Sequence, residues 1–203
     1  MRDMPTEVII STVVEGITDE AVARRLIMHV GAIPGTVYGK NGKPHLRQRI
    51  AGYNQAARRA PWLVVVDLDQ DEDCAPPLRA AWVPTPAPYL CFRVAVHEIE
   101  AWLMADAAAL SEFLGVARSR LPNDPDAISA PKEALVHLAR ASRRRSIRED
   151  MVPREGSGRV VGPAYTSRII EFASRHWRPA EAARQSDSLR RAIRGLERLV
   201  TNP

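Results

Sequence analysis

Glu7–Val14, which reads EVIISTVV, decides the fold because it is an almost unbroken run of β-branched residues. Such a run is typical of a strand buried on both faces of a parallel sheet, where neither side of the strand meets water. Glu15 and Gly16 end the run. Thr18 then suits a helix N-cap, and we expect the helix to continue through Ala21–Val30. The segment therefore predicts a strand followed directly by a helix.

The same pattern recurs further along the chain. Trp62–Asp67 (WLVVVD) and Tyr89–Val96 (YLCFRVAV) are two more apolar, strand-like runs, and Thr36–Tyr38 is a shorter one. Helical spacing lies between them at Leu46–Ala60 and after them at His97–Asp106. Strands that alternate with helices favour parallel βαβ units. We therefore predict an α/β fold with a doubly wound, mainly parallel sheet.

Beyond Asp106 the sequence changes character and contains no strand-like run. We predict a sheet domain at 1–106 and a basic helical extension packed on it at 107–203. The polar, glycine-punctuated stretch Arg143–Gly158 is expected to be a mobile loop or lid. Four segments of the extension have helical spacing: Ala107–Leu114, Lys132–Arg140, Tyr165–His176 and Ser188–Leu199.

The composition is that of an ordinary globular chain. Hydrophobic residues make up 45% of the 203 residues and charged residues 26%. No apolar run approaches the ~20 residues of a membrane span, and the N-terminus has no signal-peptide core, so we expect a cytoplasmic protein without a membrane partner. The two cysteines, Cys74 and Cys91, are expected to be reduced thiols.

The charges are unevenly distributed along the chain. Residues 1–109 hold 11 basic and 13 acidic side chains, whereas residues 110–203 hold 18 and 11. This division suits a protein with metal-binding carboxylates in one region and phosphate-binding arginines in another. A general preference for arginine over lysine would produce the same surplus.

Acidic residues follow the predicted strands at their carboxyl ends. Glu15 follows the first strand, while Asp67 and Asp69 close the strand that begins at Trp62. Ligands of open α/β sheets bind outside the carboxyl ends of the strands. Side chains two residues apart in an extended chain point to the same face. The pattern therefore predicts a site of carboxylate oxygens for Mg²⁺ or Mn²⁺, the ions that such ligands suit.

Three segments together resemble a known family. They are VVEGITDEAVARRL (13–26), VVVDLDQDEDC (64–74) and RVAVHEIEAWLMAD (93–106). They look like Toprim-like proteins related to the overcoming-lysogenization-defect (OLD) nucleases, and are similar to a bacterial group catalogued as a domain of unknown function. The family pattern is a glutamate after the first strand and a DxD after a later strand. Glu15, Asp67 and Asp69 match it.

The resemblance implies a Toprim-like fold and phosphodiester chemistry that depends on a divalent metal. By position, Asp67 and Asp69 would bind Mg²⁺, and Glu15 would bind a metal or act as general acid or base. In the nuclease branch two metals hold the scissile phosphate. Asp19 and Glu100 are the favoured ligands of a second metal, ahead of two further candidates, Asp71 and Glu98. If 97–106 is helical, Glu98 and Glu100 point ~200° apart and cannot both face the site.

Basic side chains supply candidates for binding the nucleic-acid backbone. Two lysines flank an Asn-Gly turn, a third opens a predicted helix, and a run of arginines forms the densest basic cluster. Contacts of these side chains with phosphates would make binding dependent on salt. Solvated turns and a solvated charged helix face are the alternative interpretations. The candidates are Lys40, Lys43, Lys132, Arg143, Arg144 and Arg145, with Arg148 in the same cluster.

We therefore predict an Mg²⁺-dependent nuclease of the Toprim type, acting in phage defence or DNA processing and on DNA rather than RNA. The alternative is a non-catalytic module that binds nucleic acid or an ATPase partner. The sequence has no GxxxxGK[ST] phosphate loop, so any role for ATP would need a separate ATPase protein. A phosphatase that uses Asp67 ranks last, because its DxD should follow the first strand.

Overall fold

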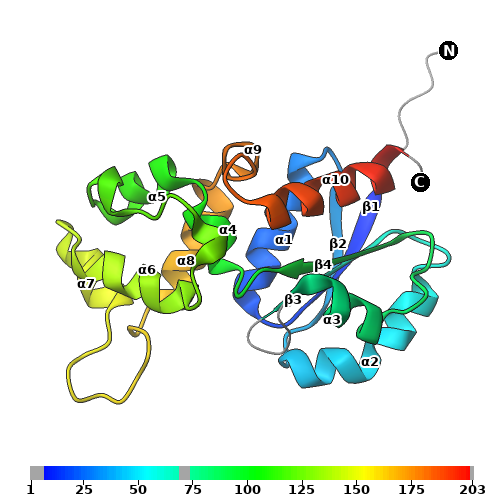
Figure 1. The fold of residues 1–203 in the computed structure, drawn as a ribbon, viewed down its shortest axis with the longest axis horizontal. Coiled ribbons are helices and arrows are strands. Elements are labelled where there is room, and N and C mark those ends of the chain that lie inside the picture. Colours follow the sequence, from blue (N-terminus) through cyan, green and yellow to red (C-terminus); the bar gives the residue numbers. More distant parts are fainter. Residues whose placement is uncertain (1–6, 69–73, 202–203) are drawn as a thin grey trace, which may run out of the picture. The chain divides into compact units, whose positions relative to one another are not determined.

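The computed structural model describes residues 7–68 and 74–201. It contains a sheet of four strands in the order β2-β1-β3-β4, formed by β1 (Ile9–Val14), β2 (Ile33–Gly39), β3 (Trp62–Asp67) and β4 (Leu90–Ala95) (Figure 1). The strands run parallel, and the prediction of an α/β fold with a parallel sheet and a helical C-terminal region is confirmed.

The strand order places a switch point in the middle of the sheet. The chain moves outward from β1 to β2 in one direction and from β3 to β4 in the other. The register pairs Ile9 with Ile33 and Ser11 with Trp62. Because β1 and β3 are parallel neighbours, both strands end at the same edge of the sheet, which is where ligands of doubly wound sheets bind.

Three helices connect the strands: α1 (Ile17–His29), α2 (Lys43–Ala56) and α3 (Ala75–Trp82). The N-cap of α1 is Gly16 and not Thr18, because Asp19 accepts a hydrogen bond from the Gly16 backbone N–H at 2.8 Å. This closes one of the orphan backbone donors at the helix start. The cap therefore lies two residues earlier than the threonine suggested.

The residues of the chain group into two compact units. The sheet unit comprises residues 1–66, 76–94 and 191–203, and the helical unit comprises 67–75 and 95–190. The expected boundary at residue 106 stays a prediction. The elements from residue 100 onward are α4 (Glu100–Met104), α5 (Ala107–Leu114), η1 (Arg118–Arg120), η2 (Pro125–Ala127), α6 (Pro131–Arg140), α7 (Arg145–Met151), α8 (Tyr165–Arg175), α9 (Pro179–Ala182) and α10 (Asp187–Thr201).

The helical unit has its own core around two tryptophans. Trp102 and Trp177 are both fully buried, and Trp177 Nε1 donates a hydrogen bond to the Trp102 carbonyl at 3.2 Å. Trp102 Nε1 donates to Ser188 Oγ at 2.7 Å. Both indole N–H groups are therefore satisfied inside the core, as buried tryptophans require.

The expectation of a mobile loop over Arg143–Gly158 is wrong for its first half, which forms α7. Ile147 and Met151 are four residues apart and both are buried, so this short helix has one apolar face. The surrounding arginines obscured this i, i+4 pair in the sequence. Across the described residues, no helix is both long and apolar enough to span a membrane.

Candidate functional site

Acidic side chains gather around a single lysine in the helical unit. Lys132 Nζ lies 3.1 Å from Glu98 Oε1 and 3.9 Å from Glu100 Oε1. The carboxylate of Asp67, the last residue of β3, also acts on the Lys132 charge. Burial alone would lower the pKa of Lys132, but Glu100, Glu98 and Asp67 outweigh it and raise that pKa above its usual value. The ammonium is therefore held in its charged form.

A sharp backbone turn brings both glutamates to the same lysine. His97 adopts a left-handed conformation with φ of 62°, and Glu98 lies in the loop between His97 and α4. The prediction of one helix over His97–Asp106 is therefore wrong at its start. It had implied that Glu98 and Glu100 point apart, whereas both approach Lys132 Nζ. A non-glycine residue at positive φ is uncommon and marks a position that the surrounding structure imposes.

Glu100 is the deepest carboxylate of this group. It is only 3% exposed, and Tyr165 at the start of α8, also 3% exposed, donates a hydrogen bond from its hydroxyl to Glu100 Oε1 at 3.3 Å. Burial, together with the charge of Glu100, raises the pKa of Tyr165 well above its usual range. The tyrosine therefore remains a hydrogen-bond donor, and Glu100 has the partner that a buried carboxylate needs.

Three carboxylates act on one ammonium group in this cluster, and Asp67 and Glu100 have further interactions of their own. When ionised, Asp67, Glu98 and Glu100 bring three negative charges, and Lys132 brings one positive charge. Glu98 also accepts a hydrogen bond from the Lys132 backbone N–H at 2.8 Å, which ties it to the start of α6. Carboxylate oxygens in a partly buried place are the ligand type that divalent cations such as Mg²⁺ prefer.

A second acidic group lies in the sheet unit where β1 ends. Glu20 accepts hydrogen bonds from Arg24 Nε at 2.9 Å and from Lys40 Nζ at 3.1 Å. Burial would raise the pKa of Glu20, but these two cations outweigh it and hold that pKa below its usual value. Asp19 caps α1 through Gly16. The structure therefore gives Asp19 and Lys40 partners within their own unit, and their predicted metal and phosphate roles stay predictions.

Of the remaining candidate metal ligands, the structure describes Glu15 but not Asp69 or Asp71. Glu15 directly follows β1 and is half-buried, and it forms interactions of its own. Asp69 and Asp71 lie outside the described residues. Within 7–68 and 74–201, no three His, Cys, Asp or Glu side chains form a ready-made metal-binding group. The DxD half of the predicted site is thus represented by Asp67 alone.

The predicted nucleic-acid residues fall into separate places. Lys43 begins α2 in the sheet unit, and Lys132 belongs to the acidic cluster. Arg143 is exposed. Arg144 donates from Nη1 to the Phe113 carbonyl at 3.3 Å, and Arg145 pairs with Glu149 at 2.7 Å, so this arginine cluster is partly committed to internal contacts.

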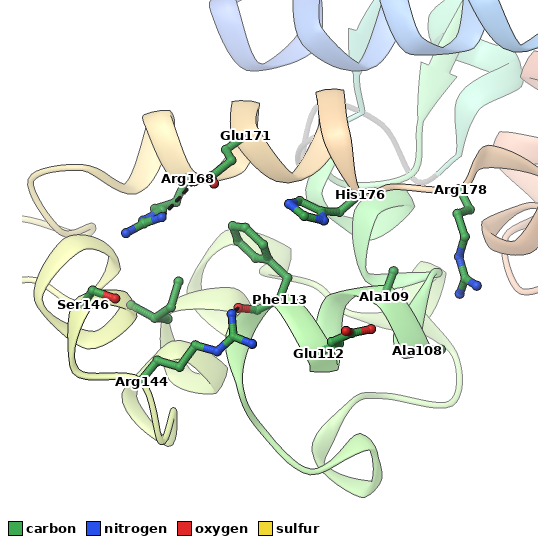
Figure 2. A pocket seen from close by; sticks show the side chains of 11 residues that line it. Ala108, Ala109, Glu112, Phe113, Arg144, Ser146, Arg168, Glu171, His176 and Arg178 are labelled. Carbon is green, nitrogen blue, oxygen red and sulfur yellow. Dashed lines mark hydrogen bonds and ion pairs between the residues drawn. The ribbon is translucent and has the colours of Figure 1, made fainter.

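Arg144 also lines a cavity of about 520 Å³ within the helical unit, between α5, α7 and α8. Figure 2 shows Arg144, Arg168 and His176 reaching toward it around the ring of Phe113. Arg168 is already paired with Asp150 and Glu171, each at 2.8 Å. Carboxylates thus neutralise part of the positive charge that lines the cavity, and the cavity is a poor site for a phosphate.

Sequence reasoning missed Tyr165 as part of the acidic cluster. It lies 65 residues from Glu100, in a segment recognisable only as a helix. No local pattern distinguishes a tyrosine that will face a carboxylate from one that only fills a core. Glu98 was among the weaker candidates because a continuous helix was expected there.

No protein-family model matches this chain, and comparison with curated proteins and with solved structures also finds no match. The resemblance to Toprim-like proteins therefore stays a prediction from the residues.

Proposed function

We propose that this protein is a divalent-metal-dependent nuclease that hydrolyses phosphodiester bonds, with DNA as the expected substrate and phage defence or DNA processing as the setting. The observation that carries the proposal is the acidic cluster around Lys132, where Glu98 and Glu100 approach one ammonium group and Asp67 acts on it. Nucleases of this chemistry need carboxylates for metal and a cation for the phosphate.

The donor set fits a hard metal ion. Asp67 ends β3 at the edge where ligands of doubly wound sheets bind, and Glu100 offers a carboxylate already oriented by Tyr165. We propose that these oxygens, with Asp69, hold Mg²⁺ or Mn²⁺. Such a metal would stabilise negative charge on the phosphate and activate water.

Glu15 joins the proposal through the sheet topology. Glu15 follows β1, and Asp67 is the last residue of β3. These two strands are parallel neighbours, and their carboxyl ends lie on either side of the switch point. The family pattern has its glutamate and its DxD in these two strand-end positions. We assign Glu15 the role of metal ligand or general acid or base on this basis.

The test measures cleavage and metal binding in parallel. Nicking of supercoiled plasmid and cleavage of single-stranded RNA are followed with Mg²⁺ or Mn²⁺, and Mn²⁺ binding is measured by electron paramagnetic resonance. Asp67→Asn keeps the shape of the side chain and removes its charge. We expect it to abolish cleavage and to weaken Mn²⁺ binding at least tenfold. Asp124→Asn, at an exposed aspartate of the helical unit, is the matched control and should change neither.

One observation favours a second candidate, the non-catalytic module. Both carboxylate oxygens of Glu98 already accept hydrogen bonds from Lys132, so this contact also stabilises the packing of the loop before α4 against the start of α6. If the wild type neither cleaves nor binds Mn²⁺, and Asp67→Asn still binds nucleic acid normally, the cluster is structural and the binding module is the better description.

A further inference from the structure

A group of arginines in the sheet unit has no role in the acidic cluster. Residues 76–94 and 191–201 contain five arginines and one carboxylate, Glu197. In the described part of the chain, no carboxylate pairs with Arg79 of α3, Arg93 of β4 or Arg198 of α10. Many arginines elsewhere have acidic partners, such as Arg168 and Arg178. Three arginines without a carboxylate partner in one unit therefore need an explanation.

The charges of all three arginines act on one side chain of the edge strand β4, Cys91. Its thiol is buried, and this burial raises its pKa, while the charges of Arg93, Arg198 and Arg79 act on it in the opposite direction. All three guanidinium groups are thus within electrostatic reach of one side chain. Arginines that share such surroundings repel each other, and an anion that binds there relieves the repulsion.

The packing of Arg93 shows that the cluster is built into the fold. A Cβ placed on Gly195 of α10 would come within 2.0 Å of Arg93 Nη2, so the guanidinium occupies the space that this glycine leaves. Arg93 Nε is buried and, in the described structure, has no hydrogen-bond partner. A glycine inside a helix costs about 1 kcal/mol relative to alanine. Here it makes room for a cation beside Arg198, which lies on the same helix face one turn later.

We propose that Arg79, Arg93 and Arg198 form a phosphate-binding cluster that holds the backbone of nucleic acid. Guanidinium groups suit this ligand because their planar fork matches two phosphate oxygens. Arg79 and Arg198 are exposed, and Arg194 extends the basic face of α10, so the surface is open enough for a polymer. The inference rests on the proposed function only in taking nucleic acid as the substrate.

The test measures binding without cleavage. Fluorescence anisotropy of a labelled DNA strand and duplex is recorded in EDTA over a range of NaCl concentrations. For Arg79→Gln/Arg198→Gln we expect at least a tenfold loss of affinity and a salt slope smaller by about 2. The control, Arg120→Gln/Arg175→Gln, removes two exposed arginines of the helical unit and should lose less than threefold. Equal losses in the two double variants would overturn the proposal.

A charge-neutral variant tests the geometry of the cluster. Gly195→Ala must displace the Arg93 guanidinium, and we expect it to weaken DNA binding several-fold at unchanged net charge. Gly52→Ala in α2, where a Cβ meets no atom within 4 Å, should bind as the wild type does. A folded Gly195→Ala variant with wild-type affinity would contradict the role of Arg93. Competition by polyglutamate as strong as that by DNA would contradict phosphate recognition.

The two proposals can fail separately. Binding in EDTA that depends on Arg79 and Arg198, without any metal-dependent cleavage, would support the arginine cluster and reject the nuclease. Cleavage that requires Asp67, with DNA affinity unchanged in Arg79→Gln/Arg198→Gln, would support the nuclease and reject the cluster. A wild-type protein that binds no DNA at low salt would also reject the cluster.

Discussion

The Tyr165 hydroxyl donates a hydrogen bond to Glu100 Oε1 at 3.3 Å, although the two residues are 65 positions apart, and both side chains are buried. We predict that Tyr165→Phe lowers the free energy of unfolding by about 1–3 kcal/mol, because it leaves a buried carboxylate with one donor fewer. Urea unfolding measures the change. The double variant Tyr165→Phe/Glu100→Gln should recover part of the loss, and a strictly additive result would show that the hydrogen bond contributes nothing.

Lys132 provides a test of the electrostatics of the cluster. Lys132→Met removes a cation that faces Glu98 and Glu100, so we expect Mn²⁺ affinity to rise about tenfold or more through lost repulsion. Cleavage should fall, because the same ammonium would stabilise the phosphate. Lys132→Arg keeps the charge and is the control for Mn²⁺ binding. Unchanged Mn²⁺ affinity in Lys132→Met would place the metal elsewhere.

Asp106 should be among the most sensitive carboxylates of the helical unit. It is 2% exposed, accepts two hydrogen bonds from the Arg178 side chain and one from its backbone, and caps α5 at Ala109. We predict that Asp106→Ala costs about 1.5–3 kcal/mol, because it removes charge-assisted hydrogen bonds, while the half-exposed Arg178 that is left behind can be solvated. Glu149→Ala, which breaks the exposed pair with Arg145, should cost less than about 1 kcal/mol. Chemical denaturation of both variants gives the comparison.

The lowered pKa of Glu20 leads us to expect that the stability of the protein depends on pH. Because Arg24 and Lys40 hold its pKa below the usual value in the folded protein, the unfolded chain binds this proton more readily. Its stabilisation is therefore present above the ordinary carboxyl pKa of 4.5 and disappears as pH falls through the folded value. Glu20→Gln should cost about 0.2–1 kcal/mol at pH 7 and nothing in strong acid.

Denaturation of Glu20→Gln at several pH values measures this dependence. The control is Glu197→Gln, because in the described residues no basic side chain pairs with Glu197. A Glu20→Gln deficit that stayed the same from pH 7 to strong acid would contradict the two cation contacts.

Replacement of glycine by alanine should change stability differently at Gly195 and at Gly52. Both lie inside helices, where alanine is favoured over glycine by about 1 kcal/mol. Gly52→Ala should gain about 0.5–1 kcal/mol because its Cβ enters open space. Gly195→Ala should lose this gain, because Arg93 must first move. Equal gains in thermal unfolding would mean that Arg93 does not occupy the space beside Gly195.

The sequence by itself determined the parallel sheet, because the apolar runs Glu7–Val14 and Trp62–Asp67 are almost continuous, as in strands that are covered on both faces, although Ile9 at the start of β1 is exposed. It also placed Glu15 and Asp67 at strand ends, since strand boundaries follow from where such runs stop. These features depend on residues next to each other in the chain, and local pattern is therefore sufficient.

Tertiary structure alone decided which side chains meet. Glu98 and Glu100 share Lys132 because His97 turns the backbone, and a helical periodicity in the sequence gave no sign of that turn. Tyr165 reaches Glu100, and Arg93 fills the space beside Gly195, through contacts between residues 65 and 102 positions apart. Such contacts depend on how helices pack, and packing is set by the shape and burial of many side chains together.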